Sequence, residues 1–191
     1  FQNNGDISLN LSPTFGHYSG PMVSASVIEE SDKAFSPIGG VMAAYKITEK
    51  LGVGTGFYVS GGTKAIFENV NLSAATGASN LQLSPEIQSA LMITEFALGA
   101  GYELIPGLRL GAAWRIVRVG GDFYTASAGT TPAANFTYVR IADVKDTRYS
   151  GFKLGAQYEA PSKAWGIGTY FRNNVNFNAA GTSSGQFALF S

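Results

Sequence analysis

The stretch that decides the fold is Tyr45-Lys-Ile-Thr-Glu-Lys-Leu-Gly52-Val-Gly54, in which a tyrosine ends one alternating segment and a glycine-alternating segment begins after a short turn. Two further copies are Tyr102-Glu-Leu-Ile-Pro-Gly-Leu-Arg-Leu-Gly111 and Tyr158-Glu-Ala-Pro-Ser-Lys-Ala-Trp165-Gly166-Ile-Gly168. The three tyrosines lie 57 and 56 residues apart, so a structural unit repeats with a regular period. An aromatic residue beside a tight turn, between strands of alternating polarity, is typical of membrane-spanning β-barrels.

Most of the chain alternates apolar residues with small or polar ones, and this period of two predicts β-strands. We expect eight strands, which begin near Ile7, Val41, Leu51, Leu83, Leu108, Phe152, Trp165 and Ser184. The fourth strand runs on to Tyr102, and its apolar phase slips by one residue near Thr94 and Glu95, which predicts a β-bulge.

The predicted connections alternate between short and long. Those near 48–50, 104–107 and 159–164 are short, whereas 16–37, 60–80, 118–136 and 173–185 are long and rich in small and polar residues. Short periplasmic turns and long extracellular loops are the pattern of outer-membrane barrels. The prediction is therefore an all-β, antiparallel transmembrane β-barrel of about eight strands, with residues 1–191 as one domain that is a whole barrel or part of a larger one.

The composition excludes several classes of protein. Charged residues make up 14% of the chain, where about 25% is usual for soluble domains. The formal net charge is zero, so we expect no nucleic-acid partner. The sequence contains no run of 18 apolar residues, so no transmembrane helix is predicted. It also contains no cysteine, which excludes thiolate metal sites. We expect no metal and no cofactor.

The predicted strands place a set of ionisable side chains on the face opposite the apolar one, inside the barrel. These are Glu86, Glu103, Arg109, Arg115, Lys153 and Arg172. Ionised groups in a narrow interior are costly unless they are paired, so we expect carboxylates and cations to neutralise one another across the lumen. The alternative is a polar path for solutes, because larger pores use similar rings of charge.

Five aromatic residues are predicted at the membrane interfaces, where tyrosine and tryptophan are enriched. They are Tyr45, Tyr102, Trp114, Tyr158 and Trp165, of which all but Trp114 fall beside the short turns. The single histidine, His17, lies near Ser19 and Asp32, but proximity in sequence does not make a catalytic triad. We expect no enzymatic activity and no catalytic residues.

Several phrases resemble the FadL/TodX family of outer-membrane transporters of hydrophobic compounds. They are Tyr45-Lys-Ile-Thr-Glu-Lys-Leu-Gly-Val-Gly-Thr-Gly-Phe-Tyr-Val, Leu83-Ser-Pro-Glu-Ile, and the segment from Gly155-Ala-Gln-Tyr-Glu-Ala-Pro through Trp165 and Phe171-Arg172-Asn-Asn-Val to Gly181. The similarity spans roughly residues 38–181. It implies a monomeric barrel that passes long-chain fatty acids or other hydrophobic molecules. Members of that family have fourteen strands and an N-terminal hatch with an Asn-Pro-Ala motif, which this sequence does not display.

Two hypotheses for the function follow. The first is a porin-like outer-membrane barrel that binds or passes hydrophobic small molecules such as fatty acids, with outer-membrane lipids as its surroundings. The alternative is a small non-transporting barrel with a plugged lumen, which serves envelope structure or displays loops to other cells and surfaces. The first predicts a ligand held by apolar residues, and the second predicts a filled interior and no ligand.

Overall fold

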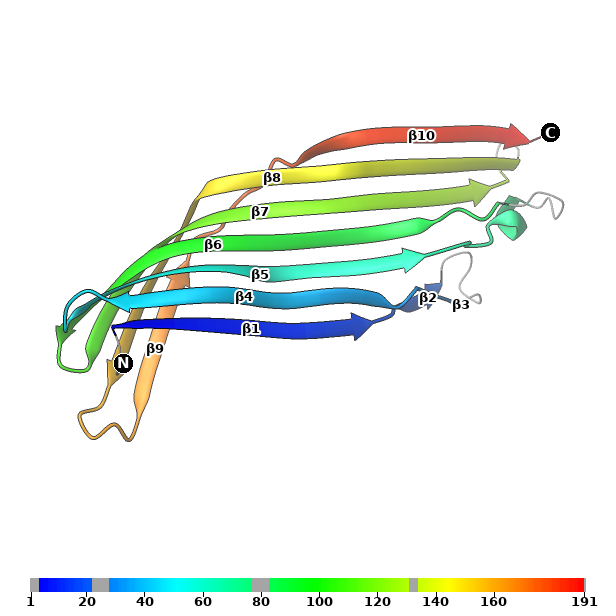
Figure 1. Cartoon of the computed structure of the whole chain (residues 1–191). Helices are drawn as coiled ribbons and strands as arrows, with labels where there is room; N and C mark the ends of the chain where they lie inside the picture. Colours follow the sequence, from blue (N-terminus) through cyan, green and yellow to red (C-terminus); the bar gives the residue numbers. More distant parts are fainter. Residues whose placement is uncertain (1–3, 22–27, 77–82, 131–133, 191) are drawn as a thin grey trace.

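The computed structural model describes residues 4–21, 28–76, 83–130 and 134–190, which form an all-β protein (Figure 1). The strands are β1 (Gly5–Gly16), β2 (Ser19–Pro21), β3 (Ile28–Glu30), β4 (Ala34–Lys46), β5 (Leu51–Phe67), β6 (Ile87–Ile105), β7 (Leu108–Gly129), β8 (Ala134–Glu159), β9 (Gly166–Arg172) and β10 (Ala180–Phe190). One turn of 3-10 helix, η1 (Ser73–Thr76), follows β5. None of the described residues belongs to a helix with the length and apolarity needed to cross a bilayer.

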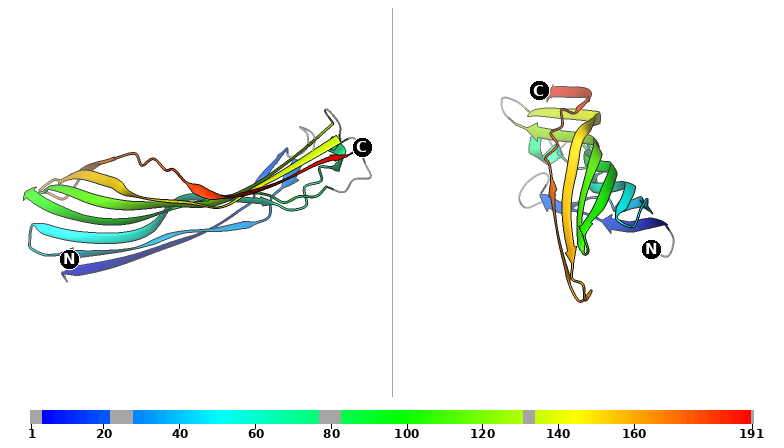
Figure 2. Two further views of the ribbon diagram at one scale, coloured as in Figure 1. Left: turned by 90° about the horizontal axis from the view of Figure 1, so that it is seen from above. Right: turned by 90° about the vertical axis from the view of Figure 1, so that its left-hand side faces the viewer.

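Eight of the strands form one antiparallel sheet in the order β1-β4-β5-β6-β7-β8-β10, with β9 also paired to β8. The sheet curls into a half-barrel, and β2 and β3 form a separate two-stranded ribbon (Figure 2). The predicted all-β antiparallel fold is thus confirmed. The sheet is open, because the only strand that pairs with β1 in the described parts of the chain is β4.

The threefold sequence repeat corresponds to three hairpin turns at one end of the sheet, on the left in Figure 1. They join β4 to β5, β6 to β7 and β8 to β9, as the short connections predicted. The β6–β7 turn is the tightest. Its Gly107 has a φ of +85°, a conformation that glycine adopts without the steric cost that other residues incur.

The two faces of the sheet differ in composition. Residues that pair across neighbouring strands point to the same side. We define the inner face as the side that carries Glu95 and lines the hollow of the half-barrel, and the outer face as the opposite side. Along the half next to the short turns, the inner face carries mainly glycine and alanine, with scattered charges.

The outer face of this half is an apolar belt that crosses the sheet from β1 to β9. Most of its large members are substantially exposed, and these include Ile7, Leu9, Val41, Phe57, Leu98, Leu110, Trp114, Leu154, Ile167 and Phe171. The small residues opposite them allow the sheet to curve around its hollow, because short side chains do not collide on the concave side.

The predicted long connections are shorter than expected. β7 continues to Gly129 and β8 begins at Ala134, so most of the predicted loop 118–136 is strand. β5 likewise runs to Phe67, and β10 begins at Ala180. These segments pair through backbone hydrogen bonds but lack the apolar alternation that the prediction relied on. Parts of the predicted loops, at 22–27, 77–82 and 131–133, lie outside the described residues.

The predicted bulge in the fourth strand is wrong in its location. The ladder between β6 and β7 is continuous from Gln88 to Glu103, so β6 has no extra residue near Thr94. The irregularity lies in β5, where the pairs Val59–Thr94 and Gly61–Ile93 leave Ser60 unpaired. The change of apolar phase in β6 therefore needs another cause, which the polar cluster described below provides.

The last position of the sheet is a divided strand. β9 pairs with Lys153–Glu159 of β8, β10 pairs with Ala134–Lys145, and residues 173–179 leave the sheet between them. The Asn173 side chain accepts a hydrogen bond from the Phe152 amide at 2.7 Å and donates one to the Ser150 carbonyl at 3.0 Å. Asp146 accepts a 2.7 Å bond from the Asn178 amide, so both ends of this segment are held against β8.

Candidate functional site

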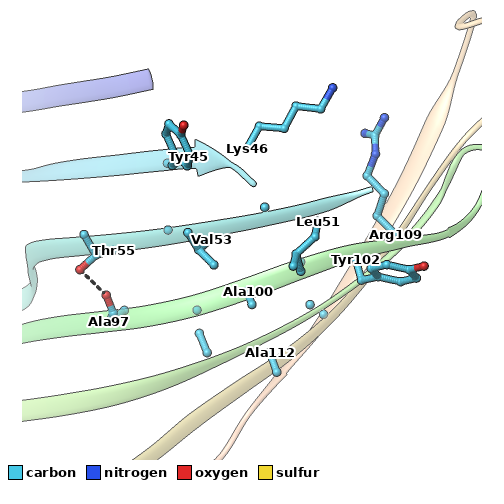
Figure 3. A pocket seen from close by; sticks show the side chains of 18 of the residues that line it. Tyr45, Lys46, Leu51, Val53, Thr55, Ala97, Ala100, Tyr102, Arg109 and Ala112 are labelled. Carbon is cyan, nitrogen blue, oxygen red and sulfur yellow. Dashed lines mark hydrogen bonds between the residues drawn. The ribbon is translucent and has the colours of Figure 1, made fainter. Parts of the chain in front are cut away.

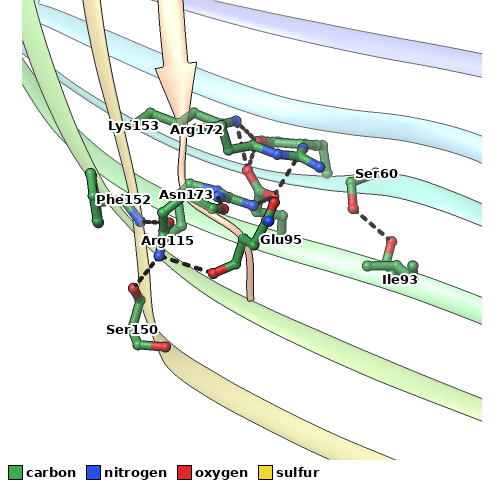
Figure 4. A network of polar contacts seen from close by, with 11 residues as sticks. Ser60, Ile93, Glu95, Arg115, Ser150, Phe152, Lys153, Arg172 and Asn173 are labelled. Carbon is green, nitrogen blue, oxygen red and sulfur yellow. Dashed lines mark hydrogen bonds and ion pairs between the residues drawn. The ribbon is translucent and has the colours of Figure 1, made fainter. Parts of the chain in front are cut away.

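A cluster of ionised side chains occupies the middle of the inner face, centred on Glu95 of β6 (Figure 4). The Glu95 side chain is 1% exposed, and its Oε2 lies 2.7 Å from Nη2 of Arg115. Its Oε1 lies 2.7 Å from Nζ of Lys153 and also accepts a hydrogen bond from the Tyr58 hydroxyl. Arg172 of β9 completes the group, with Nη1 4.0 Å from Glu95 Oε2.

Neighbouring strands bring these residues together in register. Tyr58 of β5 pairs directly with Glu95, which fixes both side chains on one face. Arg115 of β7 pairs with Ala97, two residues along β6 from Glu95, so it reaches the carboxylate diagonally. Lys153 of β8 pairs with Arg172 of β9, and both extend toward the same carboxylate. The cluster is thus built from five strands.

The cluster has more positive charge than negative. Glu95 is the one carboxylate within 4.0 Å of these three cations among the described residues. Arg115 is buried, and it is neutralised by Glu95. Lys153 and Arg172 are 29% and 52% exposed, and the Arg172 guanidinium makes no hydrogen bond to any described residue. The exposed side of the cluster therefore presents positive charge and unused donors to the hollow.

A trough of about 1270 Å³ extends from this cluster toward the short turns, along the hollow of the half-barrel (Figure 3). Its floor consists of the glycine and alanine columns of β5, β6, β7 and β8, and Met42, Tyr58 and Tyr170 form part of its wall. At the short-turn end its rim carries charges of both signs, among them Lys46, Arg109, Glu49 and Glu103. The arrangement is a mainly apolar groove with the cationic Lys153 at its cluster end.

The structure brings together three of the six predicted lumen residues, Arg115, Lys153 and Arg172. Glu103 and Arg109 also lie on the inner face but near the short turns, where they are cross-strand partners. Their charges do not pair with each other. Arg109 contacts Glu159 at 3.1 Å, and Glu103 accepts a 2.8 Å hydrogen bond from the Gly107 amide. The sixth, Glu86, precedes β6 at the opposite end of the sheet and lies outside the cluster.

Sequence reasoning missed Glu95 and Tyr58, although a signal for Glu95 was present. Unbroken alternation along β6 puts Leu91, Ile93 and Glu95 on the same face as Glu103. The slip of the apolar pattern therefore marks a face on which large apolar residues give way to a carboxylate and then to small residues. A bulge and such a change of face give the same local pattern, and only the pairing of neighbouring strands separates them.

The predicted interface aromatics lie on the outer face or beside the turns. Tyr45, Tyr102 and Trp165 are about half exposed next to the short turns, and the ring of Tyr158 packs against Trp165 with centroids 5.6 Å apart. Trp114 lies further along, in the first third of β7. Its Nε1 donates a hydrogen bond to the Tyr149 carbonyl, and the two rings stack with centroids 6.5 Å apart.

Comparison with family models, curated proteins and solved structures finds no match to this chain. The resemblance to the FadL/TodX family therefore rests on the sequence phrases alone.

Proposed function

We propose that this chain forms the wall of a bacterial outer-membrane β-barrel that binds or passes hydrophobic small molecules, with fatty acids as the model class. The observation that carries the proposal is the trough, because it combines an apolar length with the cationic Lys153, and Arg172 lies next to Lys153 as its cross-strand partner. An acyl chain fits the glycine- and alanine-lined part, and a carboxylate head group fits the cationic part.

The exposed apolar belt supports the membrane location. A contiguous apolar surface of this extent is unfavourable in water and favourable against acyl chains. The strands alternate between this belt and the small or polar inner face, as lipid-facing and lumen-facing residues alternate in outer-membrane barrels. The resemblance to the FadL/TodX family agrees with the same assignment.

Filling the trough tests ligand binding. A Cβ added at Gly101 or Gly155 would meet no described atom nearer than 3.7 Å, so larger residues fit there without displacing the backbone. We expect Gly101→Leu combined with Gly155→Leu to weaken equilibrium binding of radiolabelled oleate at least about tenfold, or about 1.4 kcal/mol. Ala156→Leu, on the outer face, is the matched control and should bind as the wild type does. Equal affinities for all three proteins would exclude the trough as the binding site.

The cationic end is tested separately. Arg172→Gln should weaken the binding of oleate and leave that of oleyl alcohol unchanged, because only the carboxylate gains from the guanidinium. Equal effects on both compounds would show that Arg172 does not contact the head group.

One observation favours the alternative function. The contacts of Glu95 with Arg115, Lys153 and Tyr58 hold charged side chains across the middle of the inner face, as a structural plug would. A barrel of this kind would bind neither oleate nor oleyl alcohol in the same assay.

A further inference from the structure

The outer face changes its character along β7. From Leu108 to Ile116 the outward residues are apolar, and the next three at the same spacing are Arg118, Gly120 and Asp122. On β8 the outward residues Phe152, Leu154 and Ala156 likewise give way to Thr147 and Lys145. Both strands therefore have an apolar half next to the short turns and a polar half beyond it.

The inner face changes in the opposite sense at the same level. Beyond Glu95 and Arg115 it carries Leu91, Ile93, Val117 and Val119, and the two valines are 4% and 8% exposed. The polarity of β7 is thus inverted across the level of the charged cluster. A strand with lipid outside one half and water outside the other would have this pattern, because each half places its apolar side chains away from water.

The length of the apolar half fits a bilayer. Leu108 to Ile116 spans nine positions of β7, which is about 30 Å at roughly 3.3 Å per residue, and a tilted membrane strand needs about 9–11 residues. The remaining residues of β7, up to Gly129, extend beyond this span.

Aromatic and cationic side chains meet at the boundary on the outer face. The stacked Trp114 and Tyr149 lie there, and Tyr149 is 62% exposed. Arg118 and Lys145 follow immediately. Arg118 pairs with Thr147 and Lys145 pairs with Gly120, so the two residues are diagonal neighbours whose Cα atoms lie about 7–8 Å apart. Both are exposed, and neither forms an ion pair with a described residue. The nearby Asp122 carboxylate accepts a 2.9 Å hydrogen bond from the Asp143 amide.

We propose that Arg118 and Lys145 bind the phosphate of a membrane lipid head group at the bilayer surface on the long-connection side, with Trp114 and Tyr149 at the boundary between head groups and acyl chains. The inference rests on the proposed membrane location. Tyrosine and tryptophan favour this boundary, and a pair of unneutralised cations just above it is complementary to a row of anionic phosphates.

Cysteine labelling in vesicles tests where the membrane boundary lies along β7. The chain has no cysteine, so Ala112→Cys, Ile116→Cys and Gly120→Cys each supply one thiol on the outer face of β7. A Cβ at Gly120 would meet nothing nearer than 3.8 Å. In phosphatidylcholine vesicles we expect a membrane-impermeant maleimide to label Gly120→Cys fully and to leave the other two protected. Labelling of all three would overturn the membrane location itself. Protection of all three would overturn only the boundary, and the proposed function would stand.

Charge reversal tests the phosphate contact. The urea midpoint of the wild type should be higher in vesicles that contain phosphatidylglycerol than in phosphatidylcholine alone. Arg118→Glu combined with Lys145→Glu should abolish this difference, and the milder pair Arg118→Gln and Lys145→Gln should do so even if the reversed protein folds poorly. Lys33→Glu, at an exposed lysine outside the sheet, is the control and should keep the difference. A wild type without the difference, or a glutamine pair that retains it, would overturn the proposal.

Discussion

Glu95 is the residue on which the inner face depends, because it balances buried positive charge. Its carboxylate accepts from Arg115, Lys153 and Tyr58 and is itself almost completely buried. Removing one partner of a buried ion pair leaves the other charge without compensation, and this costs far more than the net contribution of the intact pair.

Glu95→Gln should therefore lower the free energy of unfolding by about 3–5 kcal/mol, measured by denaturant titration in detergent micelles. Adding Arg115→Met should restore part of the loss, since it removes the uncompensated cation. Glu159→Gln is the matched control: it breaks the exposed contact with Arg109, and such surface pairs contribute about 0–1 kcal/mol. Equal losses for Glu95→Gln and Glu159→Gln would contradict the central role of Glu95.

At the scale of single elements, the sequence predicted the hairpin turns well and the strand lengths poorly. The turns carry local signals, such as Pro106-Gly107, and these positions were correct. The halves of β7 and β8 that lie away from the short turns carry Gly, Ser, Thr and charged residues. Their strand structure depends on pairing with neighbouring strands rather than on an apolar alternation. The cluster was predicted in part, because Arg115, Lys153 and Arg172 alternate regularly whereas Glu95 interrupts an apolar pattern.

The attachment of the segment between β9 and β10 to the sheet should depend on pH, because Asp146 binds it. The Asn178 amide, the Thr147 amide and Arg148 hold the pKa of this carboxyl below its usual value. A lowered pKa in the folded state means that the stabilisation is complete above the ordinary carboxyl pKa, about 3.9, and is lost as the pH falls through the lower folded value.

Hydrogen exchange of residues 173–179, corrected for intrinsic rates, should therefore show protection at pH 6 that declines below about pH 4. In Asp146→Asn the protection should be low at both pH values. Asp143→Asn is the control, because Asp143 has a φ of 55° that asparagine tolerates, and it should exchange as the wild type does. Unchanged protection in Asp146→Asn would show that the segment is held by other contacts.

At the scale of the whole molecule, the cost in folding stability of a charge on the outer face should depend on how deep in the bilayer the charge lies. Leu154 lies within the belt on β8 and is 50% exposed, whereas Thr147 lies on the same face beyond it. We expect Leu154→Arg to reduce folding stability in phosphatidylcholine vesicles by about 2–4 kcal/mol, and Thr147→Arg by less than about 1 kcal/mol. A similar loss of stability at both positions would contradict the placement of the belt in the bilayer. So would a Leu154→Arg loss that is the same in vesicles and in small micelles, which have no bilayer interior.

The direction of the outermost strands limits how this sheet can be completed. Every neighbouring pair is antiparallel, so β1 and the divided strand β9 and β10 run in the same sense. A direct seam between the two edges would therefore be a parallel one. A cylinder in which every seam is antiparallel, as in even-numbered bacterial barrels, requires an odd number of additional strands between those edges. Parity thus excludes two copies of this sheet, joined head to tail around a common axis, from forming such a cylinder.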